Sequence, residues 1–194
     1  RPPRSTLFPY TTLFRSIRPL FPKAFKNETQ VVALVISHDQ TNPPDVNAIT
    51  GASAALMISD IPFETPIAGA RISRVDGKLI FNPTYEDTAN SDLNLVMAGT
   101  ADGIVMVEAG ANEASEDDMM AALEFGHERI KQLIEIQIKL RGLLGKEKLV
   151  VEAPQVDEEL KSKIHEKTVA KLTEAMQISG KHERSDTIDR KSVV

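Results

Sequence analysis

The side chains that could perform chemistry are few in this chain, and their spacing favours structural roles. Cysteine is absent, so disulfides and thiolate metal sites are excluded. His127 falls near the apolar stripe of an expected helix, with no serine or cysteine nucleophile motif around it, which favours a packed or surface histidine over a general base. The remaining histidines have no ligand-like partners at fixed spacing, which argues against structural zinc: His38, His165 and His182. We therefore predict no catalytic residue and no metal-ligating residue.

One expected helix begins at a place that would repel an anion. The sequence there reads Asn42-Pro43-Pro44-Asp45. A helix N-terminus binds phosphate through unpaired backbone N–H groups and its positive dipole end. Here two prolines lack the amide hydrogen, and Asp45, as the expected N-cap, supplies its own carboxylate. We predict that this N-terminus does not hold phosphate.

Basic residues near an expected hairpin could form a positively charged edge. Arg71 and Arg74 are three residues apart, so they should face opposite sides of their strand. Arg74 and Lys78 lie near the hairpin tip, where charged side chains often protect a sheet edge from pairing. We expect this solvated, edge-protecting role for the basic residues here.

The strands that would position these residues are expected to form a mixed sheet. Residues 29–37 (TQVVALVIS) are almost continuously apolar, as in a strand buried on both faces. Residues 67–75 and 78–82 flank Asp76-Gly77, a strong hairpin signal because a type I′ turn needs positive φ at both central positions. Two further strands are expected at residues 93–99 and 103–109.

Helices should cover this sheet. Small residues at positions 51–55 would let the helix that follows Asp45 lie close to the strands. Ser115 and Asp118 have capping-box spacing at the start of a long helix that extends to about residue 140. Beyond Pro154, residues 156–178 are charged and helical, with a sparse apolar stripe. The expected fold class is α+β, a mixed sheet packed with helices, followed by a partial all-α domain.

Both ends of the chain read as translated adapter DNA. The DNA sequence ACGACGCTCTTCCGATCT encodes Thr-Thr-Leu-Phe-Arg-Ser, which is residues 11–16, and its reverse complement contains a frame for residues 189–194. A signal peptide is disfavoured because no continuous apolar region follows Arg1 and Arg4. We expect four parts: a tail at 1–16, a domain at 17–150, a partial helical domain at 151–188 and a tail at 189–194. The tails are expected not to pack into the core.

Charge and hydropathy limit the classes of function. The whole chain holds 23 basic and 28 acidic residues, and without the two tails 18 basic and 27 acidic residues remain. An acidic domain has no overall field that attracts nucleic acid, so any RNA contact must come from a local basic patch. No apolar run approaches the ~20 residues that span a bilayer. A soluble, cytoplasmic protein without a membrane partner is the expectation.

A set of short segments in a fixed order resembles a known family. These are IRPLFP, GASAAL, IPF, GAR, NPT, VMAGT, MVEAGA and FGHE. Their order and spacing are similar to the first RNase PH-like domain of bacterial polynucleotide phosphorylase, from Ile17 to about Leu140. The helical region after Pro154 resembles the α-domain that links the two RNase PH-like copies in that family. The resemblance implies an RNase PH-like fold and a fragment of an RNA-degrading enzyme.

The resemblance also indicates which copy this is. In the catalytic copy, serines at a helix N-terminus bind phosphate, whereas this chain has the 42–45 segment described above. The catalytic copy carries Asp-x-Lys before its Val-Ala-Gly strand, for Mg²⁺ and for the transferring phosphoryl group. Here Asp92-Leu93-Asn94 lacks the lysine. Glu86 or Asp87 could supply a weak metal site, but solvated acidic loops are commoner. We expect the non-catalytic copy.

For the full-length parent, the resemblance implies 3′→5′ phosphorolysis of RNA with Mg²⁺ and inorganic phosphate, in a homotrimer that uses the second copy. No cofactor is expected on this fragment. Arg18 is the candidate RNA-binding residue, and the alternative for it is an ion pair that anchors its Pro-rich loop. A different interpretation of the whole chain is a free-standing, non-catalytic RNase PH-like ring subunit or RNA-binding scaffold. The helical region after Pro154 favours the two-copy enzyme.

Overall fold

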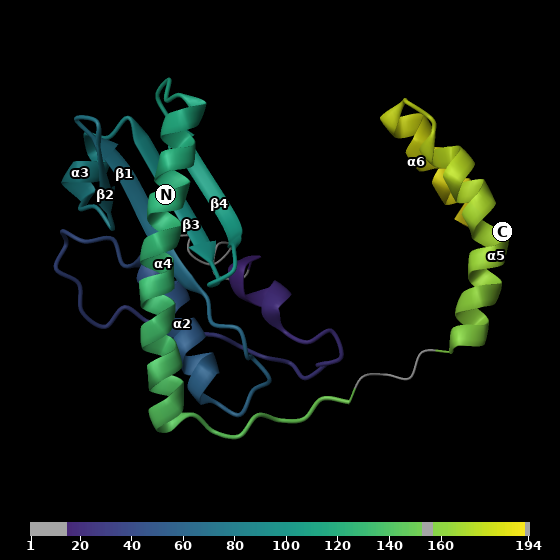
Figure 1. Ribbon diagram of the computed structural model, residues 1–194, viewed down its shortest axis with the longest axis horizontal. Helices are drawn as coiled ribbons and strands as arrows, with labels where there is room; N and C mark the ends of the chain where they lie inside the picture. The colour runs from purple at the N-terminus through teal and green to yellow at the C-terminus, as the bar shows by residue number, and fades with distance from the viewer. Residues whose placement is uncertain (1–14, 153–156, 193–194) are drawn as a thin grey trace, which may run out of the picture. The chain divides into compact units, whose positions relative to one another are not determined.

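The structure is a computed structural model that describes residues 15–152 and 157–192, with side chains described as far as residue 189. The chain divides into two compact units, and the division falls between Val151 and Glu152. The first unit contains a sheet and two long helices, and the second contains two helices (Figure 1).

A four-stranded antiparallel sheet forms the centre of the first unit. Its strand order is β2-β1-β3-β4, with β1 at Ala68–Val75, β2 at Lys78–Phe81, β3 at Leu93–Gly99 and β4 at Ile104–Ala111. The hairpin at Asp76-Gly77 is confirmed, with φ of 50° and 74° at the two turn residues. All described pairings are antiparallel. We expected a mixed sheet that includes a strand at residues 29–37. The observed sheet is antiparallel, and residues 29–37 form no strand.

The prediction of a buried strand at residues 29–37 is wrong. The segment has no regular secondary structure. Leu34 is 79% exposed and Ile36 is 96% exposed. An apolar run is buried on both faces only inside a sheet whose two faces are both covered, and this segment joins no described sheet. The segment instead lines an open cavity together with one side of α2.

The two long helices of this unit are α2, Asp45–Ile58, and α4, Glu116–Leu144. The capping box between Ser115 and Asp118 is confirmed at the start of α4. This helix crosses one face of the sheet (Figure 1), where Ile72, Leu95 and Met97 are buried against it. The opposite face packs on α2 and on the 17–25 segment, with Ala98, Met106 and Phe63 in that core.

Gly126 lets α4 lie close to the sheet. A Cβ atom at this position would be 2.3 Å from Met97 Sδ and 3.1 Å from Ile72 Cγ1. Further along, α4 packs on α2 through a buried polar group. Ser53 Oγ donates to Gln137 Oε1 at 2.7 Å, and Gln137 Nε2 donates to the Ile67 carbonyl at 3.0 Å. Their hydrogen bonds satisfy the buried polar atoms that join the two helices.

A clasp of residues 145–149 closes the C-terminal end of α2. Lys146 N donates to the Ile58 carbonyl at 3.0 Å, and Leu149 N donates to the Asp60 carbonyl at 2.8 Å. Lys148 Nζ donates to three carbonyl oxygens, those of Leu56, Met57 and Ser59, at 2.7–3.0 Å. A cation at a helix C-terminus complements the negative end of the dipole, so the clasp stabilises α2.

A short helix, α3 at Tyr85–Ala89, lies between β2 and β3. This helix was not expected from the sequence. It begins with a capping box, in which Thr84 Oγ1 accepts from Asp87 N at 3.1 Å and the Asp87 carboxylate accepts from Thr84 N at 3.0 Å. The pattern Thr-x-x-Asp at residues 84–87 was the signal that could have revealed it.

The second unit consists of α5, Glu158–Met176, and α6, Lys181–Ser192. The expected helix at 156–178 corresponds to α5, and Ala175 is buried where the two helices meet. The apolar stripe of α5 is exposed within this unit, at Leu160, Ile164 and Val169. Helix α6 extends into the range assigned to the C-terminal tail.

The expectation for the N-terminal tail falls largely on residues 1–14, which lie outside the described residues. Of the tail residues that are described, Ser16 is fully buried, and Arg15 forms an exposed ion pair with Glu108 at 3.6 Å. The adapter origin of both tails stays a prediction. No helix within the described ranges is long and apolar enough to cross a membrane.

Candidate functional site

Arg71 connects the start of α2 with strand β3. It projects from β1 toward the start of α2, where a guanidinium nitrogen bonds to the Asp45 carboxylate. A second guanidinium nitrogen donates to Asn94 Oδ1 on β3 at 2.9 Å. The Arg71 side chain is 16% exposed. The N-terminus of α2 and Asn94 on β3 are therefore neighbours, and one arginine bridges them.

The start of α2 differs by one residue from the sequence expectation. Pro44 occupies the N-cap position with φ −87° and ψ −5°, and it provides no side-chain cap. Asp45 is thus the first helical residue instead of the N-cap, because proline already has a helix-compatible φ. Asp45 Oδ1 accepts from Val46 N at 2.9 Å. A carboxylate still lies at this N-terminus, as expected, where it opposes an incoming phosphate.

Asn82 holds the backbone of Arg71 at the end of β2. Its Oδ1 accepts from Arg71 N at 3.0 Å, and its own N–H donates to the Arg71 carbonyl at 2.7 Å. Asn82 has a φ of 47°, in the left-handed region that asparagine tolerates better than most residues. This pair of hydrogen bonds ends the ladder between β1 and β2 and fixes the strand position from which the guanidinium extends.

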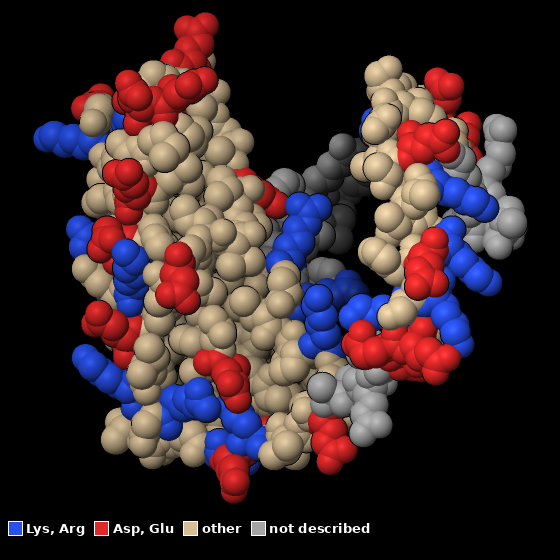
Figure 2. Space-filling model, turned by 45° about the vertical axis from the view of Figure 1, so that its right-hand side comes forward, with Lys and Arg blue, Asp and Glu red and all other residues tan. Residues whose placement is uncertain are grey.

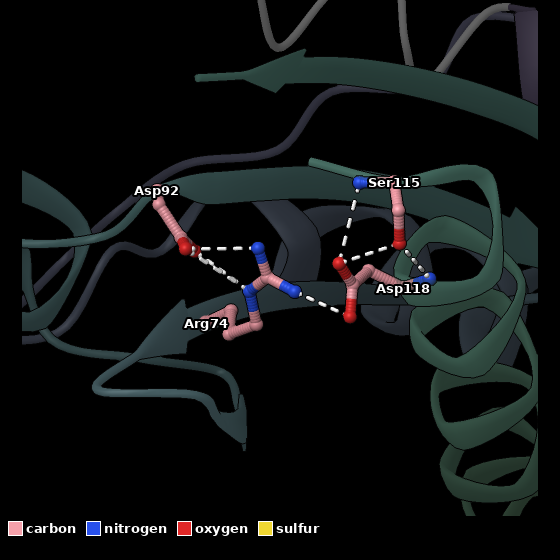
Figure 3. A network of polar contacts seen from close by, with 4 residues as sticks. All are labelled: Arg74, Asp92, Ser115 and Asp118. Atoms are coloured by element: carbon pink, nitrogen blue, oxygen red, sulfur yellow. Dashed lines mark hydrogen bonds and ion pairs between the residues drawn. The ribbon is translucent and has the colours of Figure 1, made fainter. Parts of the chain in front are cut away.

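Arg74 forms a second ionic network on the other side of β1 (Figure 3). Its Nε donates to Asp92 Oδ1 at 2.9 Å, and Nη2 contacts Asp92 Oδ2 at 2.9 Å. Its Nη1 lies 2.6 Å from Asp118 Oδ1 at the start of α4. Ser115 Oγ donates to the other oxygen of Asp118 at 2.7 Å. The network ties the ends of β1 and β3 to the N-terminus of α4.

The charges of this network shift the pKa values of its ionisable side chains. Hydrogen bonds from Arg74 first, and then from Ser115, lower the pKa of Asp118 to about 2. The Arg74 guanidinium also holds the pKa of Asp92 below its usual value, and the two carboxylates raise the pKa of Arg74. Both carboxylates are therefore ionised at neutral pH and committed to arginine.

The expectation of a solvated basic edge is wrong for both arginines. Arg71 and Arg74 do face opposite sides of the strand, as their spacing predicted, but their side chains are only 16% and 14% exposed. Each is bound by a carboxylate at or near a helix start, at Asp45 and Asp118. Sequence reasoning missed these partners because they lie 26 and 44 residues away along the chain. Lys78 alone is exposed as expected.

Asp87 and Asp92, two acidic residues near the candidate metal position, have other partners. Asp87 accepts hydrogen bonds from Thr84 in the α3 capping box, and these bonds lower its pKa. Asp92 is paired with Arg74. Within residues 15–152 and 157–192, no three His, Asp or Glu side chains converge as metal ligands. The Mg²⁺ that the resemblance implies for the parent enzyme stays a prediction.

His127 forms a packing contact within the first unit. It is half-buried on α4, and its Nε2 lies 3.0 Å from the Thr100 carbonyl, to which it donates when that nitrogen carries the proton. His38 makes a comparable contact between its Nε2 and the Asn42 carbonyl at 2.9 Å. The half-buried His127 is a packed histidine, one of the two roles expected for it, whereas no structural role was predicted for His38.

Arg18 lies in a short 3₁₀ turn, η2 at Arg18–Leu20, and is exposed. The following Phe21 anchors this segment, with its ring 5.4 Å from that of Phe63. Lys23 and Lys26 are also exposed on the same segment. In contrast, acidic side chains gather where α4 begins (Figure 2), including exposed Glu113 and Glu116. The RNA-binding role of Arg18 stays a prediction.

Comparison with known proteins agrees with this architecture. Residues 10–62 match the model of the 3′ exoribonuclease family, domain 1, and residues 65–129 match domain 2 of the same family. The first match includes η2 and α2, and the second includes the sheet and the N-terminal half of α4.

Full-length relatives extend well beyond this chain. A polyribonucleotide nucleotidyltransferase of Oceanobacillus iheyensis is 46% identical over 188 residues, which are 97% of this chain and 27% of that protein. One from Sulfurihydrogenibium azorense is 50% identical over 175 residues, which are 90% of this chain and 25% of that protein. A crystal structure of rice Rrp46 aligns with a TM-score of 0.47 and 15% identity over 52% of this chain and 49% of that one, a likeness too slight to add to the sequence matches. The chain spans about a quarter of the length of these nucleotidyltransferases and, with both family domains present in order, belongs to the 3′ exoribonuclease family.

Proposed function

We propose that this chain is part of a polyribonucleotide nucleotidyltransferase and forms its non-catalytic RNase PH-like copy. The relatives at 46% and 50% identity carry that name and match nearly all of the chain. The parent enzyme would degrade RNA from its 3′ end by phosphorolysis, releasing nucleoside diphosphates. Inorganic phosphate and RNA would be its substrates, and Mg²⁺ would be held by residues outside this chain.

The observation that carries the non-catalytic assignment is the closed network at Arg71. Phosphoryl transfer depends on positioning and on neutralising the charge of the transferring group. Here two guanidinium nitrogens of Arg71, at the start of α2, are already bound to Asp45 and Asn94, and the third, Nε, is buried. Pro43 and Pro44 offer no amide hydrogens there. A phosphate group would have to displace a carboxylate to reach the guanidinium.

The role left for this copy is to support the assembly and to guide RNA. In the proposed parent, a homotrimer in the cytoplasm, it would pair with the catalytic copy to close a ring. The exposed cations Arg18, Lys23 and Lys26 are the candidate phosphate contacts for an RNA strand. The helices α5 and α6 that follow the first unit favour this two-copy enzyme over a free-standing ring subunit.

Activity tests the assignment directly. The purified chain is incubated with poly(A), inorganic phosphate and Mg²⁺, and ADP release is measured. We expect none above a no-enzyme blank, because the loss of both the lysine and the phosphate cradle costs several powers of ten in rate. Phosphate-dependent ADP release by the chain would refute the non-catalytic assignment.

RNA binding tests the role of Arg18. We expect Arg18→Ala to weaken poly(A) binding and to reduce the dependence of log affinity on log salt by about one unit, as for one lost phosphate contact. Fluorescence anisotropy at several salt concentrations measures both. Lys131→Ala is the control, because Lys131 is an exposed cation on α4 paired with Glu128. Equal effects of the two variants would remove Arg18 as a specific contact.

A further inference from the structure

A small cavity lies beside Arg71, and the proposed function assigns it no role. Its volume is about 200 Å³. The segment leading into α2 and the end of β2 form its walls, with Asn42, Pro43, Val46, Asn47, Arg71, Asn82 and Pro83 as the lining. Pockets for drug-sized ligands measure about 300–1,000 Å³, so this cavity suits a single ring system rather than a whole nucleotide.

The lining combines unused amide groups with flat apolar walls. Among the described residues, neither the Asn47 side chain nor Asn82 Nδ2 has a hydrogen-bond partner. The Asn47 carboxamide offers both a donor and an acceptor, which is the pattern that matches the edge of a nucleobase. Asn82 adds the donor Nδ2, since its Oδ1 already accepts from Arg71 N. Half-buried Pro43 and buried Pro83 add apolar atoms to the lining.

The charges around the cavity favour a neutral ligand. Asp45 neutralises Arg71. Asp39 accepts from the backbone and side chain of Asn42, so a second carboxylate lies next to a lining residue. Hydrogen bonds from Asn42 and Thr41 lower the pKa of Asp39 to about 2, so it is ionised at neutral pH. A phosphate would meet two negative charges there, whereas an uncharged base would not.

An exposed aromatic residue is close in sequence to the cavity lining. Tyr85 follows the lining residue Pro83 by two positions, is 48% exposed, and donates its backbone N–H to the Thr41 carbonyl at 3.0 Å. The His38 ring meets it edge-on, with 6.0 Å between ring centroids. Exposed aromatic rings stack on the bases of single-stranded nucleic acid.

We propose that this cavity accepts a single nucleobase of a single-stranded RNA, read by Asn47 and Asn82, and that Tyr85 stacks on a neighbouring base. The proposal rests on the proposed function only in taking RNA as the source of the base. It assigns a binding role to the place where the family's catalytic copy would hold phosphate.

The test is a titration of the whole ¹⁵N-labelled chain with adenosine, followed through the side-chain amide signals of asparagine. Adenosine should shift the signals of Asn47 and Asn82, and inorganic phosphate in a parallel titration should not. Asn47→Leu should weaken adenosine binding on the order of tenfold, the size expected for a lost pair of base-edge hydrogen bonds. Asn27→Leu, an exposed asparagine outside the cavity, is the matched control.

Tyr85→Ala separates the two parts of the proposal. It should leave adenosine binding within about twofold and weaken poly(A) binding several-fold, because stacking on a second base needs an RNA strand. Adenosine binding that Asn47→Leu does not weaken, or phosphate that shifts the same signals, would overturn the proposal. Poly(A) binding without any response to adenosine would also overturn it and leave the proposed function standing. ADP release in the activity assay would overturn only the proposed function.

Discussion

Two arginines on one strand each neutralise a carboxylate at the start of a different helix. Arg71 binds Asp45 at the first residue of α2, and Arg74 binds Asp118 in the first turn of α4. A carboxylate at a helix N-terminus is favourable because of the helix dipole, and a guanidinium beside it removes the remaining charge. The strand β1 thereby fixes where both helices begin, which is a structural use of residues that elsewhere could serve chemistry.

Arg74 should govern the response of stability to acid. The pKa of Asp118 in the folded chain, about 2, lies below its ordinary value of 3.8. The stabilisation that the ionised Asp118 carboxylate gives the folded chain is therefore fully present above pH 3.8. It is lost as the pH falls through about 2. We expect Arg74→Met to lower the melting temperature at pH 7 and to make it fall less steeply between pH 5 and pH 2.5. Circular dichroism melts measure both quantities.

Lys131→Met is the control for this experiment, because it removes an exposed ion pair from the same helix, α4, whose first turn contains Asp118. Exposed pairs contribute little, so its melting curve should follow that of the unmodified chain at every pH. An Arg74 variant that loses stability with acid as steeply as the unmodified chain would show that other groups set the acid response.

At the scale of elements, close packing of helix on sheet depends on a residue without a side chain. Gly126 lies on α4 over Met97 and Ile72. Gly142 lies near the end of the same helix, where an added Cβ atom would have no neighbouring atom within 4 Å. Alanine substitutions at these two glycines therefore separate the effect of packing against the sheet from the effect of helix propensity.

We expect Gly126→Ala to destabilise the chain by about 1–3 kcal/mol, the usual size for overpacking a core. The methyl group would displace Met97 or move α4 off the sheet, and this cost exceeds the gain of ~1 kcal/mol from helix propensity. Gly142→Ala should be neutral or stabilising by up to ~1 kcal/mol. Urea unfolding of both variants measures the difference. Equal stabilities would show that α4 is not held against the sheet at Gly126.

Patterns within a few residues predicted the hairpin and the start of α4. Contacts between residues distant in sequence determined the candidate site, which could not be predicted. The Asp76-Gly77 turn and the Ser115 to Asp118 capping box are complete within a few residues, so the hairpin and the start of α4 could be read directly. The candidate site could not, because Arg71 reaches Asp45 across 26 residues and nothing in either segment specifies the other. Residues 29–37 have strand-forming side chains, yet strand formation also requires a neighbour to pair with.

At the scale of the whole molecule, the first unit exposes an apolar segment that a folded surface rarely shows. Val32, Leu34, Val35 and Ile36 are each more than 60% exposed. Contiguous exposed apolar surface of this kind marks an interaction site or promotes association. The segment is also free of backbone pairing among the described residues, which leaves its N–H and C=O groups available to another strand.

We expect the chain to associate in a concentration-dependent way when it is expressed alone, and Ile36→Lys to reduce that association. Ile36 is 96% exposed, so the change should alter unfolding free energy by no more than about 0.5 kcal/mol. Light scattering over a range of concentrations measures association. Ile138→Lys, the same substitution at a 53% exposed site on α4, is the control. A monomeric unmodified chain, or equal effects of both variants, would contradict the prediction.

The Lys148 clasp has a consequence for the order of events during synthesis. Lys148 and the Met57 carbonyl that it caps are 91 residues apart. At ~5–20 residues per second, roughly 5–18 s pass between the emergence of α2 and the arrival of its cap. Until then the last carbonyls of α2 depend on water and on the Ser59 hydroxyl, which bonds to the Leu56 carbonyl. The first unit therefore completes α2 only when nearly all of that unit has left the ribosome.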